Sequence, residues 1–175
     1  MFSQPKLSNN DIETYIHRLV NAERRNHNLS ELAYDPRLAY VALGHSSDMA
    51  RRNYFDHRGR DGSDASERAM RAGYPYVKRV GNLNYTGIGE NIFACGINKS
   101  TRTEIEEIRQ GNRVIKRNTR VIEDPFTSIE VARLAVNNWM SSEGHRRNIL
   151  TPHYNREGIG IASSASMIYV TQNFY

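Results

Sequence analysis

The sequence contains a single cysteine, Cys95, so it can form no internal disulfide and no cysteine-based zinc site. No apolar run approaches the ~20 residues of a membrane-spanning helix, so we expect no integral membrane association. The first residues, Met1 to Lys6, lack the apolar segment of a leader peptide. Two alternatives follow: a cytoplasmic protein, or one whose leader has been removed.

What the chain does contain is typical of one folded domain. It has 175 residues, of which 38% are hydrophobic and 25% are charged. A chain of this length buries roughly 70% of its unfolded surface, enough to form a core without disulfides. We therefore expect a single domain over residues 1–175.

The net charge of +5 is unevenly distributed. Between Lys99 and Arg120 seven basic residues stand against three acidic ones, which gives +4 in this segment alone. Such a segment can bind phosphate groups or an anionic surface. It has no aromatic residue for base stacking, which argues against nucleic acid. We interpret residues 99–124 as a basic insertion that is exposed to solvent and only partly ordered. Within it, Ile105 and Ile108 stand at helical spacing.

Capping residues and apolar periodicity predict the helices. Ser8 and Asp11 begin a helix that we expect to end near Asn26. Asp35 and Pro36 begin a second one, because aspartate caps free amides and proline tolerates the first helical position.

Two further helices are predicted, one over 64–72 and one after residues 124–125. The latter has an apolar stripe that consists of Ile129, Ala132, Val136 and Trp139. Strands are predicted over 88–95, 158–162 and 167–174, with a loop over 73–89. Helices come first and strands gather late, so the sequence predicts an α+β protein.

Two of the six histidines lie where binding groups are often found. His57 and His145 occupy polar, turn-rich stretches, and loops held by rigid helices often carry such groups. His45 shares a helix face with apolar residues and is interpreted as a packing residue. His17 and His27 have no acidic partner at ligand spacing.

Several common motifs are absent: the zinc-protease helix, the phosphate-binding loop and the nucleophile elbow. The glycines of Gly158-Ile159-Gly160 are interpreted as allowing another part of the chain to approach a strand closely. Cys95 ends an apolar segment and is interpreted as an inert buried thiol.

Six stretches, taken in order, resemble the CAP superfamily, which includes the cysteine-rich secretory proteins, the antigen 5 proteins and the plant pathogenesis-related proteins. The resemblance is greatest to its compact prokaryotic members and rests on these motifs: residues 45–50, Tyr54-Phe55-Asp56-His57 with Asp61-Gly62, Gly89-Glu90-Asn91-Ile92, residues 139–150, Gly158-Ile159-Gly160 and residues 169–174.

This resemblance implies an α-β-α three-layer sandwich with a central antiparallel sheet. It also implies a central cleft in which His57, Glu90 and His145 gather, and which holds zinc or another divalent metal in several members. Two imidazoles and a carboxylate suit Zn²⁺ and leave a fourth position open. The alternative is a hydrogen-bonded polar cluster that needs no metal.

The sequence departs from the family pattern beside the tryptophan. Animal and plant members usually place a second glutamate three positions after it, where this chain has Ser142, followed by Glu143. Either the second acid is absent or Glu143 replaces it, so we count both residues among the candidate cleft residues.

Three functions remain open. The first is a binding module for a small apolar or anionic ligand, in a secreted or cell-envelope protein, as the family implies. The second is a metal-dependent hydrolase, peptidase-like or esterase-like, with Glu143 as general base. The third is anionic-surface or nucleic-acid binding through residues 99–120. The motifs mark neither a general base nor an oxyanion stabiliser, which favours the first.

Overall fold

The structure is a computed structural model that describes residues 7–175; the prediction about Met1 to Lys6 lies outside the described residues. Its helices and strands follow in the order α1 (Asn9–Asn26), β1 (Ala33–Tyr34), α2 (Pro36–Arg52), α3 (Ala65–Arg71), β2 (Val77–Val80), β3 (Leu83–Thr86), β4 (Gly89–Gly96), β5 (Asn98–Gln110), β6 (Arg113–Pro125), α4 (Ser128–Ser141), α5 (Glu143–Ile149), β7 (Arg156–Ser163) and β8 (Met167–Phe174).

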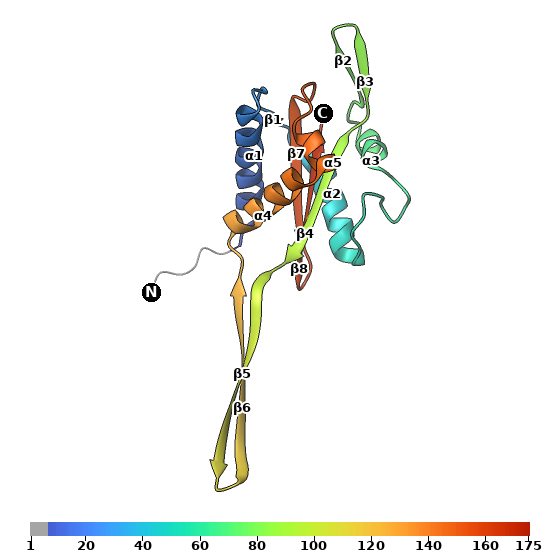
Figure 1. The fold of residues 1–175 in the computed structure, drawn as a ribbon. Helices are drawn as coiled ribbons and strands as arrows, with labels where there is room; N and C mark the ends of the chain where they lie inside the picture. Colours follow the sequence, from blue (N-terminus) through green and yellow to red (C-terminus); the bar gives the residue numbers. More distant parts are fainter. Residues whose placement is uncertain (1–6) are drawn as a thin grey trace.

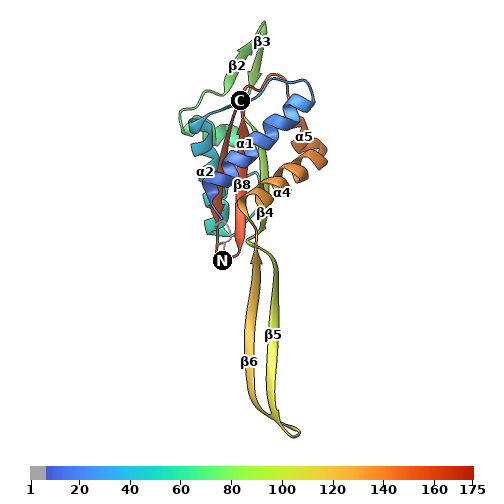
Figure 2. The same ribbon diagram turned by 90° about the vertical axis from the view of Figure 1, so that its left-hand side faces the viewer.

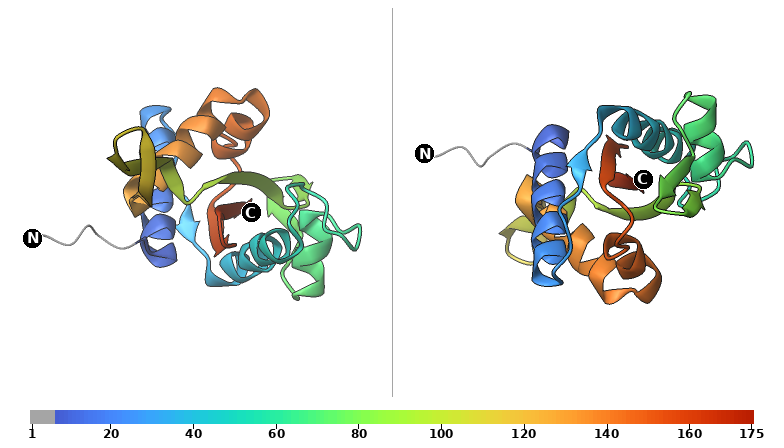
Figure 3. Two further views of the ribbon diagram at one scale, coloured as in Figure 1. Left: turned by 90° about the horizontal axis from the view of Figure 1, so that it is seen from below. Right: turned by 90° about the horizontal axis from the view of Figure 1, so that it is seen from above.

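The body of the molecule has three layers, with a four-stranded sheet of order β1-β7-β8-β4 in the middle. Helix α2 packs on one face of β7 and β8, while α1 and α4 cover the other face (Figures 1 and 3). The α+β sandwich is thus confirmed. The sheet is antiparallel except at its edge, where the two-residue strand β1 runs parallel to β7.

The predicted helix starts are confirmed. The Ser8 side chain accepts a hydrogen bond from the Asp11 amide at 3.3 Å, and α1 ends at Asn26. The Asp35 side chain accepts from the Arg37 amide at 2.9 Å and caps α2. These caps stabilise the helix ends because they satisfy amides that have no partner within the helix.

The main core lies between the sheet and the layer of α1 and α4. Trp139 on α4 is fully buried there, and its indole N–H donates to the Ile92 carbonyl oxygen of β4 at 2.9 Å. This hydrogen bond fixes α4 against the strand that carries Glu90.

The close approach predicted for Gly158 and Gly160 is also observed. A Cβ atom on Gly158 would lie 2.0 Å from the Ala39 nitrogen of α2, and one on Gly160 would lie 2.0 Å from the Leu43 nitrogen. Only glycine lets the backbone of α2 lie directly on β7.

Three segments differ from the predictions. The stretch around His145, predicted as turn-rich, forms the short helix α5. Residues 98–125 form the long antiparallel hairpin β5–β6 rather than a partly ordered insertion (Figure 2). The helical spacing of Ile105 and Ile108 was misleading, because both residues lie on a strand. The segment is rich in β-branched residues, which favour strands, and Gly111 turns the chain at φ +61. The stretch 73–89, predicted as a loop, contains the short hairpin β2–β3.

Candidate functional site

His57, Glu90 and His145 lie together although they come from three different parts of the chain. His57 lies in the loop between α2 and α3, Glu90 near the start of β4, and His145 on α5. The ring centroids of the two histidines are 6.1 Å apart. The His57 Nδ1 atom is 2.9 Å from Glu90 Oε1.

Arg68 on α3 completes this cluster. Its guanidinium donates to Glu90 Oε2 at 2.6 Å, to the His57 carbonyl oxygen at 3.1 Å and to the Ser63 carbonyl oxygen at 2.8 Å. The Glu90 side chain is 4% exposed, so this ion pair is almost fully buried. Arg68 therefore fixes both the carboxylate and the loop that carries His57.

The ion pair also sets the orientation of the His57 ring. A carboxylate paired with arginine is ionised and only accepts hydrogen bonds, so His57 Nδ1 carries the proton that points at Glu90. The other ring nitrogen, Nε2, is then left for a ligand. The His57 side chain is 51% exposed, in keeping with a group that faces an open cleft.

His145 is held in place by an amide network. Asn91 on β4 donates to the His145 carbonyl oxygen at 3.2 Å, and Asn148 on α5 donates to the Asn91 side-chain oxygen at 2.9 Å. Asn148 also donates to the Glu90 carbonyl oxygen at 3.0 Å. Burial lowers the pKa of His145 and the neighbouring His57 lowers it further, so this imidazole is neutral near pH 7.

A cavity of about 400 Å³ opens beside the two histidines. Phe55, Ile92, Phe93 and Ala94 form its apolar wall, and Asp56, His57, Asn138 and His145 supply its polar groups. The site thus combines an apolar wall with two imidazoles. Glu90 holds the His57 ring, whereas the buried Nδ1 atom of His145 has no hydrogen-bond partner.

Ser142 and Glu143, the other two candidates, lie at the junction of α4 and α5. Ser142 is the N-cap of α5. The Glu143 side chain is 78% exposed and forms an ion pair with Arg147 at 2.7 Å. Neither residue lines the cavity beside the histidines.

The geometry does not fit a metal site in which Glu90 is the third ligand. Both carboxylate oxygens are already occupied, one by His57 and the other by Arg68. Within residues 7–175, no group of three or more His, Cys, Asp and Glu side chains is arranged to hold a metal ion. The polar residues that line the cavity are the two histidines with Asp56 and Asn138.

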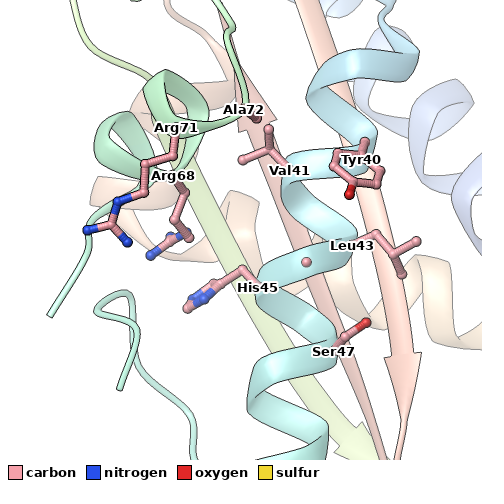
Figure 4. Close-up of a pocket in the computed structure, with 9 residues that line it drawn as sticks. Tyr40, Val41, Leu43, His45, Ser47, Arg68, Arg71 and Ala72 are labelled. Atoms are coloured by element: carbon pink, nitrogen blue, oxygen red, sulfur yellow. The ribbon is translucent and has the colours of Figure 1, made fainter. Parts of the chain in front are cut away.

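A second cavity of about 570 Å³ lies between α2 and α3, and Arg68 is among the residues that line it (Figure 4). His45 projects from α2 toward the side on which Arg68 and Arg71 lie, while Tyr40 and Leu43 lie on the opposite side of the helix. His45 is buried and its Nε2 donates to the Asp56 carbonyl oxygen at 2.9 Å, as expected for a packing residue.

Sequence reasoning did not single out Arg68 or Asn148. Asn148 lies within residues 139–150, one of the motifs that resemble the CAP superfamily, but the sequence did not indicate what its side chain does. Arg68 lies on a short helix without any distinctive motif. Its role depends on a contact with Glu90, 22 positions away, that only the folded chain makes.

Comparison with known proteins agrees with this fold. The model of the cysteine-rich secretory protein family, CAP, matches residues 17–174. The chain belongs to this family.

Among curated proteins, the uncharacterized protein YkwD of Bacillus subtilis is 29% identical over 157 residues, which cover 89% of this chain and 44% of the relative. A solved extracellular protein with an SCP domain from Bacillus anthracis is 28% identical with a TM-score of 0.60, covering 99% of this chain and 45% of that one. An outer surface protein of Borrelia burgdorferi shares the fold at 14% identity and a TM-score of 0.58, covering 97% of this chain and 96% of its own.

The chain therefore spans less than half the length of the curated relatives and of the Bacillus anthracis protein that it matches. No helix within residues 7–175 is long and apolar enough to cross a membrane.

Proposed function

We propose that the chain is a binding module whose cleft takes a small molecule with an apolar body and one hydrogen-bonding group. The observation that carries this proposal is the cavity of about 400 Å³ in which an apolar wall adjoins the imidazoles of His57 and His145. Small-molecule sites have this composition and this size, with ~300–1,000 Å³ lined mainly by apolar side chains.

The charges around the cleft favour a neutral polar group over an anion. His145 is neutral near pH 7 because its pKa is lowered. Arg68, which holds the loop of His57, is already paired with Glu90. An anionic ligand would therefore meet no free cation among the residues that line the cavity.

The hydrolase alternative has less support. Glu143, its candidate general base, is exposed, is paired with Arg147 and does not line the cavity. A general base must come within hydrogen-bond reach of the proton that it removes. The Glu90 oxygens contact His57 and Arg68, and no third ligand joins the two histidines within residues 7–175, so the residues present do not favour a metal-dependent reaction.

The bacterial relatives also bear on location. The matched Bacillus anthracis protein is extracellular and the Borrelia burgdorferi protein is an outer surface protein. We accordingly propose that this chain acts outside the cytoplasm, in a secreted or envelope-attached protein.

The test of the cleft uses the single tryptophan as a reporter. Trp139 donates to the carbonyl of Ile92, a residue of the cavity wall, so a molecule in the cavity changes the environment next to the indole. We expect 1-decanol to change the Trp139 fluorescence saturably, and decanoate to bind more weakly at pH 7.

The variant Ala94→Phe fills the cavity and should abolish the signal. Ala162→Phe provides the control, because residue 162 lies on β7 and is not part of the cavity wall. Binding of decanol that is unchanged in Ala94→Phe would refute the assignment of the site. Loss of decanol binding on chelation of metal ions would favour the metal alternative instead.

A further inference from the structure

The β5–β6 hairpin extends from the body as an isolated two-stranded ribbon (Figures 1 and 2). Each strand has 13 residues, which corresponds to a length of about 40 Å at ~3.3 Å per residue. None of its residues from 98 to 125 belongs to a hydrophobic cluster of the described chain. An isolated hairpin is only marginally stable in water, so a covering partner would stabilise this one.

The register of the hairpin defines an apolar face and a charged face. Ile105 lies opposite Thr119, and Thr103 lies opposite Val121. Residues directly opposite each other share a face, as do residues two apart on one strand, so these four form one surface, which we call the apolar face. Ile105 is 59% exposed and Val121 is 57% exposed.

The other face carries mainly charged and polar residues, together with Ile122 opposite Arg102 and Ile108 opposite Lys116. Glu104 lies opposite Arg120, and Glu106 lies opposite Asn118, which donates to it at 3.2 Å. Arg102 forms an ion pair with Glu104 at 3.3 Å. Ile108 is 42% exposed and Ile122 is half-buried, so the apolar side chains of this face are less exposed than Ile105 and Val121 on the apolar face.

Charges of opposite sign border the apolar face at its two ends. Toward the tip, Glu107 accepts from both Arg109 and Arg117 at 2.6 Å, which leaves one excess positive charge. Toward the body, Glu123 lies opposite Thr101, two positions beyond Val121 on the same face. The face is therefore positive at one end, apolar in the middle and negative at the other end.

We propose that the apolar face binds the apolar face of a second copy of this chain, with the two hairpins running in opposite directions. A surface with opposite charges at its ends is complementary to itself when a twofold axis passes through its centre. Such an axis near Ile105 and Thr119 places Arg109 of each chain near Glu123 of the other. The two bodies then lie at opposite ends of the paired hairpins.

The size of the ribbon sets the strength of this association. A face about 40 Å long and about 10 Å wide offers roughly 400 Å² per copy, about half of what each partner contributes to a standard interface. We therefore expect a reversible dimer with a dissociation constant on the order of 10–100 μM.

Sedimentation equilibrium over about 1–500 μM protein tests the proposal with a matched pair of variants. Ile105→Asp places a charge in the apolar face, and Ile108→Asp makes the same change three residues away, opposite Lys116 on the charged face. We expect Ile105→Asp to raise the dissociation constant at least tenfold, and Ile108→Asp to change it less than about threefold.

A charge exchange tests the orientation of the two copies. Glu123→Arg and Arg109→Glu should each weaken the dimer, and the double variant should restore it. The thermal midpoint of the body, followed by Trp139 fluorescence, should stay unchanged in all variants, because the hairpin lies outside the hydrophobic clusters.

Three results would overturn the proposal: a monomer at every concentration, equal effects of the two isoleucine variants, or no restoration in the double variant. Phosphatidylglycerol vesicles form a separate arm. Binding of a monomeric protein to these vesicles that Ile105→Asp abolishes would assign the face to a lipid surface instead.

Discussion

Replacement of Gly160 by alanine tests the contact that joins α2 to the sheet. The new Cβ would lie 2.0 Å from the Leu43 nitrogen and 2.4 Å from the Ala42 carbonyl carbon. Ordinary contact needs about 3.4 Å, so α2 has to retreat by roughly 1.4 Å. A gap of even ~0.5–1 Å forfeits a quarter to a half of the dispersion energy of each atom pair.

Overpacking usually costs ~1–3 kcal/mol. We expect Gly160→Ala to lower the free energy of unfolding by about 3 kcal/mol or more, at the upper end of this range. The obstructing atoms belong to the helical backbone, which cannot rotate away as a side chain can. Urea unfolding followed by Trp139 fluorescence measures this loss in the free energy of unfolding.

Gly44→Ala is the matched control on the same helix. No atom lies within 4 Å of a Cβ at Gly44, so the change should stabilise the protein by ~0.5–1 kcal/mol through the helix preference of alanine. The expected clash with α2 would be refuted if Gly160→Ala lowered the free energy of unfolding by less than about 1 kcal/mol, or if both variants changed this free energy in the same direction.

Three further predictions concern the core and its buried polar groups. Trp139→Ala should lower the free energy of unfolding by about 3–5 kcal/mol in urea titrations, because it removes a fully buried side chain; a loss under ~1 kcal/mol would contradict the packing of α4. The hydrogen bond to Glu157 raises the pKa of His17 above 6.5, so the stability that this pair contributes is complete below pH 6.5 and is lost as the pH rises through the raised pKa. His17→Gln keeps a donor without the titrating charge, and equal pH slopes for it and the parent between pH 6 and 8.5 would exclude this role. Burial raises the pKa of the Cys95 thiol to about 11, so at pH 8 a disulfide reagent should label the native protein at least ~10-fold more slowly than the unfolded one, and equal rates would contradict the burial.

Local signals in the sequence located most of the helices and the last two strands. Ser8 and Asp35 cap α1 and α2 where the sequence predicts, because a cap depends on residues two or three positions away. The strand β8 was predicted for a similar reason, since Ile168, Val170 and Phe174 alternate toward one face and are all buried.

The β5–β6 hairpin shows the limit of such signals. The charge of the segment was correctly read, but its two isoleucines fit a helical spacing as well as a strand. Strand pairing depends on the partner strand, which begins at Arg113 beyond the turn. The same limit applies to His17, whose partner Glu157 is 140 positions away.

Sequence alone indicated the family, the α+β class and the three neighbouring residues His57, Glu90 and His145, because ordered motifs carry that information. Only the tertiary structure decided what Glu90 does there. Its two oxygens face His57 and Arg68, and that pairing arises when α3 and the loop before it pack beside β4. A carboxylate can bind a metal or bind its neighbours with the same atoms, and the packing of those neighbours decides between the two.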